Sequence, residues 1–169
     1  MKSGRGRRML MIAVILALVL SAAVVGAGQL GWLSGREPAD LGVRDGRLKP
    51  PSMTPNSVSS QASLYLDHPQ RPYADIAPLP LKGDARASMA RLKAVLQGMD
   101  GVTIVKDEPE YLYAQCRTPL LRYVDDLELW ADPLTGVIQV RSASRLGRKD
   151  FGVNRKRIDA LRERYLAAS

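Results

Sequence analysis

The first hydrophobic feature of the chain is an apolar run with no polar alternation. No residue between positions 9 and 34 is charged, and this stretch exceeds the ~20 residues needed to cross the hydrocarbon core of a bilayer. A helix packed on a soluble core would show a polar stripe, which this run lacks. The pattern therefore predicts a transmembrane signal anchor over residues 9–33, with Trp32 placed as an interfacial aromatic residue.

Prolines and glycines dominate the pattern that follows. Proline interrupts helices because it lacks an amide proton and its ring clashes with the preceding turn. Residues 34–83 are therefore expected to form an extended arm that leaves the membrane and wraps around the domain. The prolines that exclude long helices here are Pro38, Pro50, Pro51, Pro55, Pro69, Pro72, Pro78 and Pro80.

Regular periodicities return in residues 84–169. Apolar residues recur at helical spacing up to Gln97, after an N-cap residue at Asp84. Four strand-like segments follow, and Asn154 is expected to cap a last helix. The order predicts an α+β fold, in which two helices pack on one face of an antiparallel four-stranded meander. The four predicted strands cover residues 102–106, 110–116, 121–131 and 137–146.

The register of the last hairpin follows from side-chain chemistry, because facing side chains on one sheet surface interact. A shift by one residue would set Arg141 against Leu127 and mix charged with apolar positions. The preferred register keeps one face apolar and pairs charges on the other. Its pairs are Trp130–Val137, Leu127–Val140, Leu129–Ile138, Asp126–Arg141 and Glu128–Gln139, with Asp125 opposite Ser142.

The positive charge of the chain is unevenly distributed, and its position predicts the orientation of the apolar run in the membrane. The net charge is +8, of which Lys2, Arg5, Arg7 and Arg8 supply half. Positive residues before an apolar run stay inside the cell, so residues 1–8 are predicted to form a cytoplasmic tail and the domain to be exported across the inner membrane. A cleaved, secreted form is the alternative, because Val25 and Ala27 suit a signal-peptidase site. Basic residues of the last helix form either a solvated face or a contact with anionic headgroups.

Cysteine and histidine usage excludes several kinds of chemistry. A single cysteine, Cys116, excludes an internal disulfide framework and a thiolate metal site. No cysteine stands directly after the apolar run, so a lipoprotein anchor is also excluded. A Ser-His-Asp triad would depend on His68, which lies in the proline-rich arm. We therefore expect no cofactor and no metal, and Cys116 is expected to be an inert core thiol.

Two constellations carry the candidate chemistry. Arg141 and Arg145 lie on one face of the predicted strand and can together bind a carboxylate or phosphate, and Asp126 is the acidic group beside them. The candidate ligand-binding set is completed by Ser142, Ser144 and Asn154. The alternatives are a structural network that joins strand to helix, and a hydrolase in which Asp126 or Glu128 acts with the two arginines.

Several segments resemble the domain of unknown function 1499 family: GVRDGRL at 42–48, PNSVSSQ at 55–61, YVDDLE at 123–128, VRSASRLG at 140–147 and DFGVNRKRI at 150–158. The resemblance covers about residues 41–165. It implies bacterial or plastid proteins, often with export or membrane segments, and no established activity. Pro51 and Ser57 stand where that family commonly has cysteines, which argues against a thiol-dependent role at these positions.

These observations favour a membrane-tethered, non-enzymatic module of the cell envelope. Membrane lipid is its expected partner through the N-terminal helix, and its domain is expected to bind an anionic small molecule, a lipid headgroup or an envelope protein. Nucleic acid is not expected, because the basic residues lie on the exported side and no nucleic-acid motif is present. The alternatives are the hydrolase described above and a structural or assembly factor of the envelope.

Overall fold

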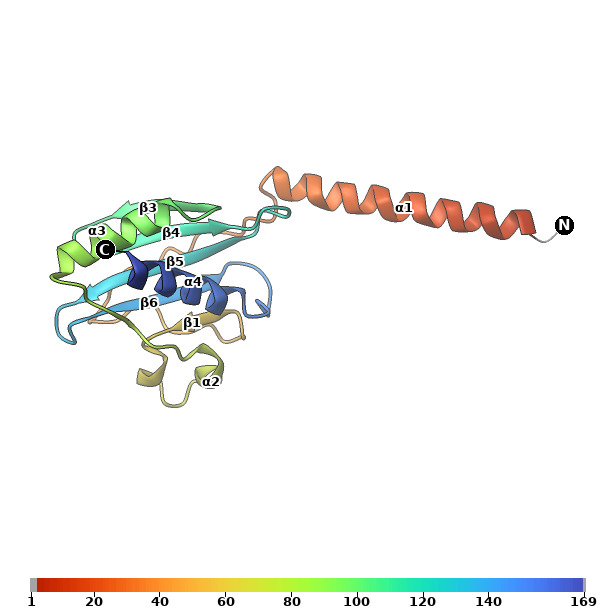
Figure 1. Ribbon diagram of the computed structural model, residues 1–169. Coiled ribbons are helices and arrows are strands. Elements are labelled where there is room, and N and C mark those ends of the chain that lie inside the picture. The colour runs from red at the N-terminus through yellow and green to blue at the C-terminus, as the bar shows by residue number, and fades with distance from the viewer. Residues whose placement is uncertain (1–2, 169) are drawn as a thin grey trace.

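Helix α1, Ser3–Gln29, projects away from the rest of the molecule (Figure 1). The structure, a computed structural model, describes residues 3–168. Residues 5–29 are long and apolar enough to cross a membrane, and the most apolar part of the helix packs against nothing else in the protein. The expected N-terminal apolar helix is therefore present, and its length fits a bilayer.

One antiparallel sheet forms the centre of the domain. Its strands follow the order β1-β6-β5-β4-β3, and β2 also pairs with β6. The α+β fold and the meander are confirmed, but two short strands from the arm extend the sheet to six. The strands are β1 (Ser57–Ser59), β2 (Leu79–Pro80), β3 (Val102–Asp107), β4 (Tyr111–Arg117), β5 (Val124–Asp132) and β6 (Val137–Ser144).

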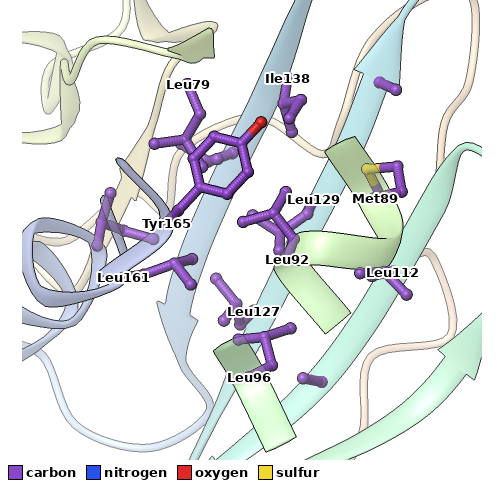
Figure 2. Close-up of a cluster of buried hydrophobic side chains, with 14 of the residues drawn as sticks. Leu79, Met89, Leu92, Leu96, Leu112, Leu127, Leu129, Ile138, Leu161 and Tyr165 are labelled. Atoms are coloured by element: carbon purple, nitrogen blue, oxygen red, sulfur yellow. The ribbon is translucent and has the colours of Figure 1, made fainter. Parts of the chain in front are cut away.

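Helices α3 (Ala85–Gln97) and α4 (Val153–Ala167) cover one face of this sheet, as predicted. Figure 2 shows leucines of both helices directed toward Leu127 and Leu129 of the central strand β5. Burial of such side chains is the main source of the domain's stability. The side chain of Asp84 caps α3 by accepting a hydrogen bond from Ala87 N at 2.7 Å, as expected.

The start of α4 differs from the prediction. Asn154 does not cap this helix, because the N-cap is Gly152, whose φ of 81° suits glycine. The carboxylate of Asp150 accepts hydrogen bonds from Gly152 N at 3.0 Å and from Asn154 N at 3.1 Å. Asp150 thus performs the capping, and the Asn154 side chain is available to the sheet.

The arm covers the other face of the sheet with its first part, where Gly42 and Leu48 contact the strands. It contains the short helices η1 (Ala62–Leu64) and α2 (Arg71–Ala74), and no longer helix lies between residues 34 and 83 of the described chain. Leu48 of the arm packs with Tyr111, Tyr113 and Trp130 in a small second cluster. The sheet therefore lies between two helices and the arm.

Arginines of α4 bind the far part of the arm. Arg155 donates to Tyr73 O at 2.6 Å, and Arg162 donates to Pro78 O at 2.8 Å and to Ala77 O at 2.6 Å. Several of the basic residues expected on a solvated face thus hold arm carbonyls instead, because a guanidinium offers five donors to unpaired backbone oxygens.

The register of the last hairpin was predicted wrongly by two residues. Glu128 lies opposite Arg141, and Asp126 lies opposite Ala143. The cause is Asp132, which pairs with Val137 and shortens the connection, since its carboxylate accepts from Leu134 N at 2.9 Å and Thr135 Oγ1 at 2.6 Å. An even shift keeps each side chain on its face, but it changes every partner. The observed pairs include Leu127–Ser142, Leu129–Val140, Trp130–Gln139 and Asp125–Ser144, and Trp130 lies on the arm face.

Candidate functional site

The six candidate residues do not form one site, because the sheet separates them. The side chains of Asp126, Arg141 and Arg145 form contacts on the arm face. Those of Ser142, Ser144 and Asn154 form contacts on the helix face. Alternation along β6 explains the division, since successive side chains point to opposite sides of a strand.

On the arm face, Glu128 is the centre of the first ion pair. Its carboxylate accepts from Arg141 Nη1 at 3.2 Å, Tyr111 OH at 2.9 Å and Gly42 N at 2.8 Å. The side chains of Glu128 and Arg141 are 0% and 4% exposed. Arg141 also donates from Nε to Pro50 O at 3.4 Å. Gly42 and Pro50 belong to the arm, so this pair joins the arm to the sheet.

Asp126 is the centre of a second, parallel ion pair. Arg145 donates to its Oδ1 from Nη2 at 2.7 Å and to its Oδ2 from Nε at 3.1 Å. Tyr113 OH donates to the same carboxylate at 2.7 Å and accepts from Arg145 Nη2 at 2.8 Å. Both charged side chains are buried. Bidentate pairs of this kind are among the strongest hydrogen-bonded contacts in proteins.

The surroundings keep these tyrosines protonated. Burial, strengthened by the hydrogen bond to Asp126, raises the pKa of Tyr113 to about 12. Burial, strengthened by the nearby Glu128 charge, also raises the pKa of Tyr111. Burial alone would lower the pKa of Arg145, but its hydrogen bond and charge interaction with Asp126 raise it instead. The two tyrosines therefore stay neutral hydrogen-bond donors, and Arg145 stays charged, over the physiological pH range.

On the helix face, Asn154 links α4 to β6. Its Oδ1 accepts from Ser142 Oγ at 2.6 Å, and its Nδ2 donates to Ser144 Oγ at 3.0 Å. Arg157, one helical turn further on, donates to Asn154 Oδ1 at 2.7 Å and to Asp125 Oδ2 at 2.6 Å. Sequence reasoning missed Arg157 as a partner, although its i+3 spacing places it on the Asn154 face.

Asp150 closes this network at the start of α4. Tyr73 OH and Asn154 Nδ2 both donate to its carboxylate, the latter at 2.8 Å. Burial opposes ionisation of Asp150, but hydrogen bonds from Tyr73, Gly152 N and Asn154 outweigh it and lower its pKa. Nearby, Asn56 Oδ1 is the one buried side-chain polar atom without a hydrogen-bond partner among residues that the structure describes.

A hollow of about 480 Å³ lies beside this network, at the end of the sheet nearest α1. Of the six candidate residues, Ser144 lines it. Its apolar wall was not predicted, although apolar residues at positions 146 and 151 in an otherwise polar, basic loop were a signal for it. The lining residues are Leu33, Thr118, Tyr123, Asp125, Ser144, Leu146, Gly147, Lys149, Asp150, Phe151 and Val153.

The remaining candidates occupy structural positions. His68 lies in the arm, where its Nδ1 accepts a hydrogen bond from Gln70 N at 3.1 Å. Cys116 is buried in the main core, as expected. Burial raises the pKa of its thiol to about 11, which suppresses the reactive thiolate.

A comparison with family models agrees with the resemblance noted in the sequence. The family described as "Protein of unknown function (DUF1499)" matches residues 47–165. The match covers all six strands, helix α3 and all but the last two residues of α4, and the chain belongs to this family. No curated protein and no solved structure matches the chain.

Proposed function

We propose that this member of the DUF1499 family is a membrane-tethered, non-enzymatic binding module of the cell envelope. In this proposal α1 crosses the inner membrane once, residues 1–8 lie in the cytoplasm and the α+β domain lies on the periplasmic side. The cations that precede the apolar run support this orientation, because positively charged flanks stay inside.

The observation that carries the proposal is the junction between α1 and the domain. Gly28 is buried against Leu121, and a Cβ atom at position 28 would lie 2.5 Å from Leu121 O. Gln29 Nε2 donates to Leu120 O at 2.9 Å. Cleavage after Ala27 would turn this packed junction into a free terminus. The contacts therefore support a retained anchor that is continuous with the folded domain.

The polar networks support a binding role over the hydrolase alternative. A general acid or base must reach the proton that it transfers, whereas Asp126 and Glu128 are buried and each binds an arginine and a tyrosine. Arg141 and Arg145 are likewise engaged with these carboxylates. The hollow beside Ser144 is open to an external ligand, so we assign binding to that end of the domain.

A pair of fusions after Ser169 tests the proposed topology. Alkaline phosphatase, which needs disulfides to fold, should be active there, whereas a reporter active only in the cytoplasm should be silent. Replacing Arg5, Arg7 and Arg8 by glutamate in the same fusion should reduce phosphatase activity, because the positive flank is removed. Phosphatase that is inactive in the unchanged chain, with an active cytoplasmic reporter, would contradict the proposed orientation.

A further inference from the structure

We infer that the hollow beside α1 binds an acyl chain of an anionic phospholipid from the bilayer that holds α1. The inference rests on the proposed tether and deepens it by naming the ligand class. It stands on three features of one end of the domain: its position next to the membrane span, its apolar surface and its unpaired positive charge.

The position follows from the fold. The β4–β5 loop, residues 118–123, and the β6–α4 loop, residues 145–152, both lie at the end of the sheet from which α1 projects (Figure 1). Leu33, four residues after the last residue of α1, is itself part of the hollow's wall. A bilayer crossed by α1 therefore has its surface beside both loops.

Several large apolar side chains are exposed at this end. Phe151 is 87% exposed, and Leu120 and Leu146 are also exposed. Trp32, three residues after the end of α1, is also exposed. Tryptophan is enriched where the membrane meets water. Leu146 and Phe151 line the same hollow as Leu33 and Tyr123. Grouped exposed apolar surface marks an interaction site, and the adjacent apolar helix favours lipid as the partner.

The charge at this end suits an anionic headgroup. Arg122, Arg148 and Lys149 are exposed in the two loops, and no ion pair involves them within residues 3–168. The single acidic residue of these loops, Asp150, is buried and hydrogen-bonded to Tyr73. Basic residues beside a membrane attract anionic lipids.

The interior of the hollow suits a hydrocarbon chain better than a polar metabolite. Its acidic and serine side chains already have partners, because Asp125 binds Arg157, Asp150 binds Tyr73 and Ser144 binds Asn154. Lys149 is the lining cation that remains for a headgroup at the rim. The surface that remains available comes from Leu33, Tyr123, Leu146, Phe151 and Val153. A small polar ligand would find few unsatisfied hydrogen-bond partners there, whereas an acyl chain needs none.

Photo-cross-linking of the full chain in nanodiscs tests this inference. The discs contain phosphatidylcholine and a phosphatidylglycerol with a diazirine at the end of one acyl chain. After irradiation, peptide mass spectrometry should find cross-links on α1 and also on residues 118–123 and 144–153. Cross-links confined to α1 would overturn the inference and leave the tether intact. Absence of cross-links on α1 as well would contradict the proposed function itself.

Two variants and a matched control locate the bound chain. V153W should fill the hollow and F151D should repel hydrocarbon, so each should lose most domain cross-links and keep those on α1. L134D is the control, because Leu134 is 88% exposed in the turn between β5 and β6. This turn lies at the end of the sheet opposite to α1 (Figure 1). Equal losses in F151D and L134D would overturn the inference. So would equal domain cross-linking by phosphatidylcholine that carries the same diazirine, since the inferred site prefers an anionic headgroup.

Discussion

At the scale of single residues, the buried charged side chains of the described domain all have hydrogen-bonding partners. Glu128 and Arg141 form one such pair, and Asp126 and Arg145 form another. Replacing a buried pair by apolar residues is often neutral, but removing one partner leaves an uncompensated charge. The pairs therefore contribute specificity to the contact between arm and sheet, and their loss from one side is expected to be severe.

The R141A variant should lower the free energy of unfolding by about 3–5 kcal/mol, because Glu128 would remain buried without its counter-charge. Adding E128Q should recover part of this loss, since the neutral amide is less costly to bury. Adding D126N should recover none, because Asp126 binds Arg145. Urea unfolding of the full chain in detergent measures all three. Recovery by D126N instead of E128Q would contradict the observed register.

Because of Asp150, the free energy of unfolding should decrease at acid pH. Its pKa lies below its ordinary value in the folded protein, so ionised Asp150 stabilises the fold above the unfolded-state pKa of about 3.9. D150N should therefore cost about 1–3 kcal/mol at pH 7, since the hydrogen bonds from Tyr73 and Gly152 N lose their charged acceptor.

The difference between wild type and D150N should shrink as pH falls below about 4, where the wild-type carboxyl takes up a proton. Thermal unfolding at several pH values measures this difference. A stability difference that stays constant from pH 7 to pH 3 would show that ionisation of Asp150 does not stabilise the fold.

Cys116 should resist thiol reagents in the native protein. Burial both blocks access and raises the pKa of its thiol to about 11, so little thiolate exists near pH 8. Labelling by a maleimide, followed by mass spectrometry, should be slow before denaturation and complete after it. Rapid labelling of the folded chain would contradict burial of this strand.

At the scale of elements, the seating of α1 on the β4–β5 loop depends on one glycine. G28A should weaken the junction, because the added Cβ would meet Leu121 O at 2.5 Å. G26A is the matched control, since a Cβ at position 26 has nothing within 4 Å. Hydrogen exchange of residues 118–123 in nanodiscs should accelerate in G28A alone. Equal exchange in both variants would show that the helix is not seated there.

Elements with a long periodic pattern were predictable from the sequence. Helices α3 and α4 and strands β3 to β6 have enough residues for their spacing to reveal a buried face. Strands β1 and β2 have three and two residues and lie among prolines, so local pattern carries no signal for them. Their pairing with β6 is set by tertiary contact.

The candidate site was predictable in its residue types but not in its geometry. The arginines and carboxylates were expected to pair, yet the shift of two residues gave Arg141 a different partner from the one predicted. Arg157 and Tyr73 come from α4 and from the arm, so their contacts with Asp125 and Asp150 depend on how distant segments pack. Hairpin length, set by Asp132, decided the register.

At the scale of the whole molecule, three layers lie at one end of a membrane-length helix. The helices and the arm cover both faces of the sheet, and the buried ion pairs are internal to these layers. The end of the domain beside α1 combines exposed apolar side chains, exposed basic side chains and a hollow. In the proposed tethered state, this end of the domain lies at the membrane surface.

The mass of the mature protein, measured after an alkaline carbonate wash of membranes, tests the retained anchor most directly. The tethered state predicts that the protein stays in the membrane pellet and that its mass includes α1, because Gly28 and Gln29 belong to the folded junction. A protein that the wash releases, and whose mass corresponds to a chain starting at Gly28, would contradict the retained anchor.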